Sequence, residues 1–202
     1  MNKRKLLLTS AGLSSETVAQ GFESMAEGLK DQPVAIITTA AEGKEENKYS
    51  QLAKKQIEDM GFANIDFVDF ETEPNKDLSS YGVFYVCGGN TFKLLKFAKE
   101  ANFKSSIEEL FKRNGLYIGV SAGSIIVSPS VQIAGEIEPD DNEVGLDDLT
   151  GLNLVNMIIL PHYSLEIEEE VVAFEKKYSV AVERLNNSQA VFIKDDKEIV
   201  VG

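Results

Sequence analysis

Residues 116–123, Leu-Tyr-Ile-Gly-Val-Ser-Ala-Gly, place a Gly-x-Ser-x-Gly pattern directly after a short apolar run. An apolar run that meets small residues in this way predicts a buried strand that turns sharply into a helix. The glycines let strand and helix approach, and the serine at the tip exposes its hydroxyl at the end of the sheet. The stretch predicts a nucleophile elbow with Ser121 as the candidate nucleophile, although small residues also occupy many strand–helix junctions for packing reasons alone.

The rest of the chain repeats this alternation of short apolar runs and longer amphipathic segments. The predicted strands cover 5–9, 34–38, 65–68, 83–87, 117–120 and 157–160. The predicted helices cover 15–30, 42–60, 90–99, 104–113, 122–127 and 165–178. This order predicts an α/β fold in which helices cover both faces of a mostly parallel sheet.

The end of the chain and one internal segment depart from the alternation. Three β-like runs at 179–184, 189–194 and 198–201, separated by polar turns, predict a small antiparallel C-terminal extension. Residues 130–153, rich in Asp, Glu and Gly, predict a mobile loop with a hairpin beside the elbow. The chain has 202 residues, 43% of them hydrophobic, so we expect one α/β hydrolytic domain over residues 1–202.

The charge balance and the cysteine count exclude several classes of protein. With 33 acidic and 20 basic residues the formal charge is −13, which argues against a nucleic-acid partner because such a protein needs a basic surface. No apolar run approaches the ~18–20 residues that span a bilayer, so we expect no membrane partner. The one cysteine, Cys87, rules out an intramolecular disulfide and fits the reducing cytoplasm. The sequence leaves a homodimer open.

His162, the one histidine of the chain, follows the apolar run 157–160. A serine hydroxyl needs a base to take its proton, and histidine is the side chain that most often does so near neutral pH. The carboxyl ends of parallel strands converge on one crevice, so we expect His162 and Ser121 to meet there. A lone histidine beside a proline turn is otherwise more often structural.

Gly88 and Gly89 end another predicted strand and open a helix. Adjacent glycines bring bare backbone N–H groups close to a ligand, and in a hydrolase this turn would supply one oxyanion donor and the N–H of Ala122 the other. Phosphate binding competes, but no lysine follows in the P-loop arrangement. A plain turn with Asn90 as helix N-cap is the structural alternative. One histidine and one cysteine far apart make no ligand cluster, so we expect neither a metal nor a cofactor.

Three motifs together resemble the peptidase E and cyanophycinase family of serine peptidases. They are Cys-Gly-Gly-Asn-Thr-Phe at 87–92, Gly-Val-Ser-Ala-Gly-Ser at 119–124 and Leu-Pro-His-Tyr-Ser at 160–164. The similarity keeps this order from about residue 34 to residue 192. It implies a class I glutamine-amidotransferase-like α/β fold in which serine replaces the amidotransferase cysteine.

The resemblance also implies roles for individual residues. Ser121 would be the nucleophile and His162 the general base, with oxyanion donors from Ala122 and from the Gly88/Gly89 turn. In this family, peptidase E removes N-terminal aspartate from small peptides, and cyanophycinases cut an aspartate-containing storage polymer. The implied substrate is therefore a small peptide.

A third residue that orients the histidine matches the family at two positions. Counting from Ser121, the acid in the stretch after the elbow falls at Glu136, which we rank first. A late turn that usually carries glutamate in the family falls near Asn187, ranked second, because an amide can still orient an imidazole ring. Asp147 and Asp148 are further candidates, since their segment is predicted to lie beside the elbow.

Aspartyl specificity requires a cation that binds the substrate side chain, and arginine is the natural reader of a carboxylate. Where peptidase E has a basic-containing helix start after its histidine, residues 166–170 read Glu-Ile-Glu-Glu-Glu. Arg113 and Arg184 are the only arginines beyond residue 4, and neither is obviously placed for this task. The acidic run instead favours a free amino terminus or a basic side chain, which makes aspartyl specificity doubtful.

These observations predict a cytoplasmic serine peptidase that hydrolyses small peptides through Ser121 and His162. An esterase or acyl transferase with the same elbow is one alternative. A binding or regulatory protein that keeps the fold without activity is the other. A glutamine amidotransferase is less favoured, because the elbow carries serine rather than cysteine.

Overall fold

The central sheet has seven strands, most of them parallel. The computed structural model describes residues 4–195 and 197–202, and the sheet order is β3-β2-β4-β5-β1-β8-β9. The strands are β1 (Lys5–Thr9), β2 (Val34–Ile37), β3 (Ile65–Val68), β4 (Val83–Val86), β5 (Leu116–Val120), β8 (Ala190–Lys194) and β9 (Lys197–Val201). The first five run parallel, β8 is antiparallel to β1, and β9 is antiparallel to β8. The predicted fold class is confirmed, including an antiparallel C-terminal part.

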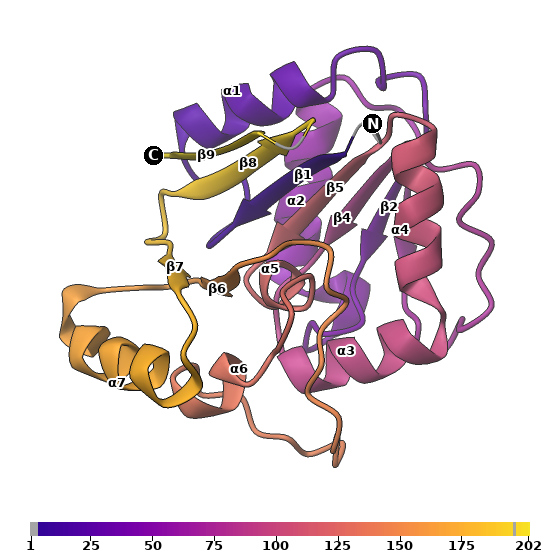
Figure 1. Ribbon diagram of the computed structural model, residues 1–202. Coiled ribbons are helices and arrows are strands. Elements are labelled where there is room, and N and C mark those ends of the chain that lie inside the picture. The colour runs from indigo at the N-terminus through magenta and orange to yellow at the C-terminus, as the bar shows by residue number, and fades with distance from the viewer. Residues whose placement is uncertain (1–3, 196) are drawn as a thin grey trace.

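Helices cover both faces of this sheet (Figure 1). The helices are α1 (Glu16–Met25), α2 (Lys48–Asp59), α3 (Thr91–Glu100), α4 (Phe103–Lys112), α5 (Ala122–Ile125), α6 (Ile133–Glu136) and α7 (Glu168–Tyr178), with short 3₁₀ turns at Lys44–Glu46 and Leu165–Ile167. Successive strand side chains point to opposite faces. Leu7 accordingly packs with Phe22 and Ile57 under α1 and α2, while Leu8 packs with Ile107 under α4. Within the described residues, no helix is both long enough and apolar enough to cross a membrane.

A second, smaller sheet departs from the prediction. The run expected at 157–160 forms β6 (Ile158–Leu160), which pairs in parallel with β7 (Val182–Arg184) in a separate two-stranded sheet. The first of the three C-terminal β-like runs therefore does not join β8 and β9 in an antiparallel extension. Three-residue strands carry too short a pattern to specify either their partner or its direction. Both strands bury their apolar residues in the core that also contains Val171 of α7.

The segment 130–153 is also built differently from the prediction. It contains α6, and its backbone is closed by one antiparallel bridge between Ser130 and Thr150, so the expected hairpin is not formed. Val131 and Ile133 are fully buried in the main core. These apolar side chains, spaced between polar residues, tie the segment to the main core.

Candidate active site

Ser121 lies at the turn between β5 and α5 with φ +50° and ψ −111°. Residues other than glycine rarely adopt this backbone conformation. Its N–H donates to the carbonyl of Thr9 at 3.0 Å, which ties the turn to the end of β1. A Cβ at Gly119 would lie 2.5 Å from the carbonyl oxygen of Gly123, and a Cβ at Gly123 would lie 2.5 Å from that of Val86. Both glycines of the pattern are therefore required by the close approach of strand and helix.

His162 stands between Ser121 and Asn187 in one hydrogen-bonded row. Its Nε2 lies 3.0 Å from Oγ of Ser121, and its Nδ1 lies 2.7 Å from Oδ1 of Asn187. An amide oxygen only accepts hydrogen bonds, so this contact places the ring proton on Nδ1. The lone pair of Nε2 then faces the serine hydroxyl, which is the arrangement a general base needs.

His162 reaches this position from the loop after β6 rather than from the main sheet. It adopts φ +54°, in the left-handed region. Asn187 lies in the turn between β7 and β8, and this turn is brought to the end of β1 because β8 pairs with β1. The expectation that His162 would follow a strand of the main sheet is thus corrected, while its proximity to Ser121 is as expected.

Ser10, just after β1, is a residue that the sequence did not single out. Its Oγ accepts the backbone N–H of His162 at 2.7 Å and donates to Oδ1 of Asn187 at 3.0 Å. The same Oγ lies 3.4 Å from Nδ1 of His162, and the residue is fully buried. A signal was present, since Ser10 is a polar residue at the carboxyl end of a buried strand, the same kind of position that points to Ser121.

Glu136, ranked first as the third member, is placed elsewhere. Its carboxylate accepts hydrogen bonds from Lys177 at 3.0 Å, from Gln132 at 3.0 Å and from the hydroxyl of Tyr178. Burial raises the pKa of Glu136, but the hydrogen bonds from Tyr178 and Lys177 outweigh it and hold the pKa below its ordinary value. The structure does not bring this carboxylate to His162, because the short helix α6 turns it toward α7.

The two further acidic candidates do not reach the row either. Asp148 forms an ion pair with Lys99 at 2.8 Å, and its other oxygen accepts the N–H of Thr150. Asp147 is not among the described residues that line the pocket at Ser121. Of the candidates weighed from the sequence, Asn187 is the one that contacts the imidazole.

Glu138 is a second residue that the sequence did not single out. The pKa of Glu138 is raised above its ordinary value, chiefly by burial and also by the neighbouring Asp140. The charge of His162 acts in the opposite direction. This segment is held against the start of α3, where Oδ2 of Asp140 accepts the N–H of Thr91 at 2.8 Å. Glu138 is a half-buried residue two positions after the one at which an acid was expected.

The Gly88/Gly89 turn lies directly beside the serine. A Cβ at Gly88 would lie 3.1 Å from Cβ of Ser121 and 3.6 Å from its Oγ. Gly89 has φ +132°, and a Cβ there would lie 2.0 Å from the carbonyl oxygen of Ala40. A side chain at Gly89 would therefore require the backbone to move, and a side chain at Gly88 would crowd Ser121.

The backbone N–H groups around Ser121 are available as donors. In residues 4–195 and 197–202, the N–H groups of Gly88, Gly89 and Ala122 have no hydrogen-bond acceptor. Asn90 accepts the N–H of Lys93 at 2.9 Å, so it also caps α3 as the structural alternative expected. The turn is thus a helix start whose preceding N–H groups are free to receive an anion.

A pocket of about 490 Å³ opens at these groups. Its lining includes Ser121, His162 and Asn187, together with Tyr49 and Leu52 of α2, whose exposed fractions are 66% and 49%. No lysine or arginine is among the described residues that line it. Nowhere in residues 4–195 and 197–202 do three or more His, Cys, Asp or Glu side chains form a group that could hold a metal ion.

Cys87 also lines this pocket, but its thiol is buried. Its exposed fraction is 5%, and burial raises the pKa of the thiol to about 12, although a hydrogen bond from Ser50 acts in the opposite direction. The thiolate is the reactive form of cysteine. A thiol held protonated in this way is not a nucleophile near neutral pH.

Arg113, Arg184 and the acidic run 166–170 make their contacts elsewhere than in the lining of the pocket. Arg184 is held by Glu168 at 2.8 Å and by Glu175 at 3.0 Å. Arg113 donates to the carbonyl of Tyr81 at 3.2 Å. The run 166–170 leads into the first turn of α7, where carboxylates suit the helix dipole. Neither these two arginines nor residues 166–170 are among the described residues that line the pocket at Ser121.

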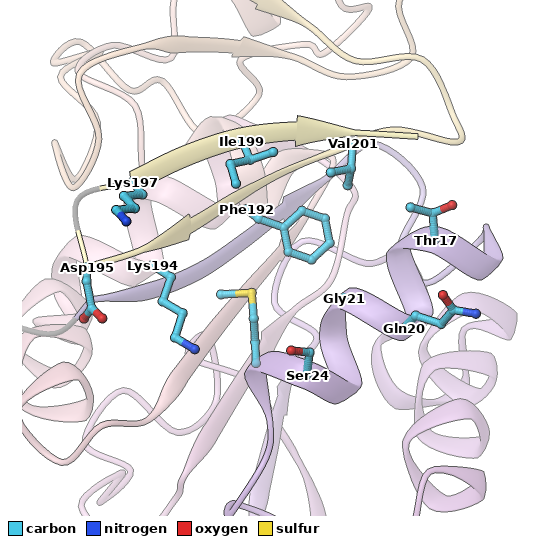
Figure 2. A pocket seen from close by; sticks show the side chains of 11 residues that line it. Thr17, Gln20, Gly21, Ser24, Phe192, Lys194, Asp195, Lys197, Ile199 and Val201 are labelled. Atoms are coloured by element: carbon cyan, nitrogen blue, oxygen red, sulfur yellow. The ribbon is translucent and has the colours of Figure 1, made fainter.

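A larger, open depression of about 680 Å³ lies between α1 and the β8–β9 hairpin (Figure 2). Phe192 projects from β8 toward Gly21 of α1, and Ile199 and Val201 come from β9 (Figure 2). Its lining contains none of the residues around Ser121. The pocket at the end of β1, β4 and β5 is therefore the candidate active site.

Known proteins share both the sequence and the fold of this chain. The model of peptidase family S51 matches residues 6–201. An uncharacterized peptidase of Listeria monocytogenes is 31% identical over 98% of this chain and 97% of its own length, and the peptidase E of a Nostoc strain is 28% identical over 81% of this chain and 67% of its own.

Solved structures agree with these matches. The crystal structure of a peptidase E-like protein from Listeria monocytogenes superimposes with a TM-score of 0.81 at 28% identity and covers 98% of both chains. A peptidase from an acI-B1 actinobacterium shares the fold, with a TM-score of 0.75 at 18% identity over 100% of this chain and 88% of that one. This chain belongs to peptidase family S51 and is a peptidase of the peptidase E type.

Proposed function

We propose that the protein is a serine peptidase that hydrolyses small peptides, with Ser121 as nucleophile and His162 as general base. The observation that carries this proposal is the 3.0 Å contact between Nε2 of His162 and Oγ of Ser121, with the ring proton held on Nδ1 by Asn187. Nucleophile, base and orienting group thus stand in hydrogen-bonding order, as covalent catalysis by serine requires.

In the first step, Oγ of Ser121 forms a bond to the peptide carbonyl carbon while Nε2 of His162 takes the hydroxyl proton. The carbonyl oxygen becomes an oxyanion that accepts hydrogen bonds from the N–H groups of Ala122 and of the Gly88/Gly89 turn. One such donor contributes roughly 10²–10³ to the rate. The C–N bond then breaks as His162 gives its proton to the leaving amine. A water, deprotonated by His162, releases the acyl group in the same way.

Asn187 orients the imidazole but adds no negative charge. In serine peptidases with an acidic third member, the carboxylate also stabilises the imidazolium formed during the reaction. The charge of His162 opposes the rise that burial causes in the pKa of Glu138, so Glu138 is the candidate for a supporting charge. We assign the orienting role to Asn187 and a weaker electrostatic role to Glu138.

The pocket favours peptides whose side chain at the cleaved bond is not acidic. Its lining has no lysine or arginine among the described residues, while Tyr49 and Leu52 offer apolar surface. A buried or half-buried carboxylate needs a paired cation, and Arg184 is already paired with two glutamates. Aspartyl specificity is therefore not part of the proposal. The single cysteine supports a cytoplasmic location for such an enzyme.

The test is hydrolysis of a dipeptide and tripeptide library, with products followed by mass spectrometry. Wild type should release products, and Ser121→Ala and His162→Ala should each abolish release while thermal unfolding shows an intact fold. Product release that survives in either variant contradicts the mechanism. A preference for matched ester substrates over peptides would indicate the esterase or acyl-transferase alternative, and no turnover of any substrate would indicate a binding protein.

A further inference from the structure

Two adjacent residues at the end of β1 hold both halves of the proposed catalytic pair. The carbonyl of Thr9 accepts the N–H of Ser121 at 3.0 Å, and Oγ of Ser10 accepts the N–H of His162 at 2.7 Å. Ser121 and His162 both have φ in the left-handed region, so each backbone needs such an anchor. The end of β1 therefore sets the distance between nucleophile and base.

The hydroxyl of Ser10 has one proton, and one acceptor in the structure receives it. The proton is donated to Oδ1 of Asn187 at 3.0 Å, because an amide oxygen only accepts, while the same Ser10 oxygen accepts the backbone N–H of His162. Ser10 is fully buried, so water does not replace these partners. Oδ1 of Asn187 consequently receives two hydrogen bonds, one from Ser10 and one from Nδ1 of His162.

A neutral amide differs from a carboxylate in that it has two unlike ends. If the amide of Asn187 turned over, its NH₂ group would face Nδ1 of His162, and the ring proton would move to Nε2, against the hydroxyl of Ser121. Such a ring cannot take the serine proton. The turned amide would also leave the Ser10 proton without its 3.0 Å acceptor, with Nδ1 at 3.4 Å as the remaining neighbour.

We propose that Ser10 is a positioning residue whose hydroxyl fixes the orientation of the Asn187 amide and thereby keeps the proton of His162 on Nδ1. The inference rests on the proposed function for its consequence, since the tautomer matters only if His162 acts as a base. It explains how a site with asparagine as the third member presents an acceptor to the serine. Ser10 acts through Asn187 and His162 and does not contact the reacting atoms.

The direct test is the tautomer of the imidazole, read by ¹⁵N NMR of histidine-labelled protein. The chain has one histidine, so each ring signal belongs to His162 without further assignment. Above the pH at which the ring is charged, wild type should hold its proton on Nδ1. Ser10→Ala should shift population to the Nε2–H form. Inactivation by a small fluorophosphonate should slow roughly 10-fold, by analogy with the loss of an outer hydrogen-bond partner of a metal-binding histidine.

Ser14→Ala is the matched control. Oγ of Ser14 donates to the backbone carbonyl of Asn187 at 2.6 Å, so it holds the same turn without touching the amide or the imidazole. This variant should keep the proton on Nδ1 and inactivate within about twofold of wild type. A loss in Ser14→Ala equal to that in Ser10→Ala would mean that general anchoring of the turn, and not the amide, is responsible, and would overturn the proposal.

The proposal and the proposed function fail in different ways. A folded Ser10→Ala protein that keeps the wild-type tautomer and inactivation rate overturns the role of Ser10 and leaves the peptidase mechanism standing. If the tautomer shifts as expected but neither wild type nor any variant gains a fluorophosphonate adduct, the role of Ser10 is supported and the catalytic function is contradicted. If thermal unfolding shows that Ser10→Ala does not fold, Ser10→Cys keeps the volume with a weaker donor and should shift the tautomer in the same direction. An unshifted tautomer in Ser10→Cys then overturns the proposal.

Discussion

Glu136 on α6 and Asn187 before β8 are the two residues ranked highest from the sequence as partners of His162, and the structure uses them in opposite ways. The charged one is paired with Lys177 and Tyr178, which fasten α6 to α7. The neutral one contacts the imidazole at 2.7 Å. Strand pairing, and not distance along the chain from the nucleophile, therefore selects the residue that contacts the general base.

The physical reason lies in the register of β1 and β8. Their antiparallel pairing sets Thr9 opposite Ala190, so the residue after β1 faces the turn before β8. Ser10 and Asn187 meet there, next to the end of β5 that carries Ser121. α6 lies in the segment 130–153, whose own contacts direct Glu136 toward α7.

The largest expected difference between the two regions is in rate. Asn187→Ala removes the acceptor of the Nδ1 proton, so inactivation by a fluorophosphonate should slow roughly 100-fold, less than the loss seen when a charged third member is replaced. Glu136→Gln should stay within about twofold of wild type. The two variants are compared by intact-protein mass against time. Equal losses would mean that Glu136 also acts on the site.

A carboxylate at the position of Asn187 should have the opposite effect. Asn187→Asp keeps an acceptor for both Ser10 and Nδ1 of His162 and adds a charge that stabilises the imidazolium. The inactivation rate should rise by roughly 10-fold. A slower Asn187→Asp protein with an intact fold would show that the site requires the amide itself.

Replacing Glu136 should change the free energy of unfolding rather than the rate of inactivation. Its pKa is lowered in the folded protein, so its contribution is fully present above the ordinary glutamate value of 4.5 and is lost as the pH falls through the lower folded pKa. Glu136→Gln should reduce the unfolding free energy by about 1 kcal/mol near pH 7, and the difference from wild type should shrink in acid. Urea unfolding at pH 7 and pH 3 measures both values, and a difference that grows in acid contradicts the sign.

The smallest expected effect is a difference in inactivation rate between variants of Glu138 and Glu136, which lie two residues apart. Glu138→Gln removes a charge that interacts with His162, so the fluorophosphonate rate should fall by about threefold, as for a weak, partly screened pair. Glu136→Gln is its matched control. If Glu138→Gln slows the reaction as much as Asn187→Ala, the electrostatic role belongs to Glu138 as a principal member of the site.

Much of the fold could be predicted from the sequence, because the central strands are buried on both faces and read as short apolar runs between amphipathic helices. β6 and β7 could not be placed, since a strand of three residues carries too short a pattern to specify its partner. Ser121, Gly88 and Gly89 were predictable from small residues at strand ends. Ser10 was marked only by its place after a buried strand, and its role could not be predicted because that role arises from the pairing of β1 with β8, which brings together residues 177 positions apart.

The proposed activation of Ser121 by His162 is tested most directly by intact-protein mass after exposure to a small fluorophosphonate. Cys87 does not compete, because burial raises the pKa of its thiol to about 12. Wild type should gain one adduct, and folded Ser121→Ala and His162→Ala proteins should gain none. An unmodified wild type with an intact fold, or an adduct that persists in Ser121→Ala, would contradict the claim.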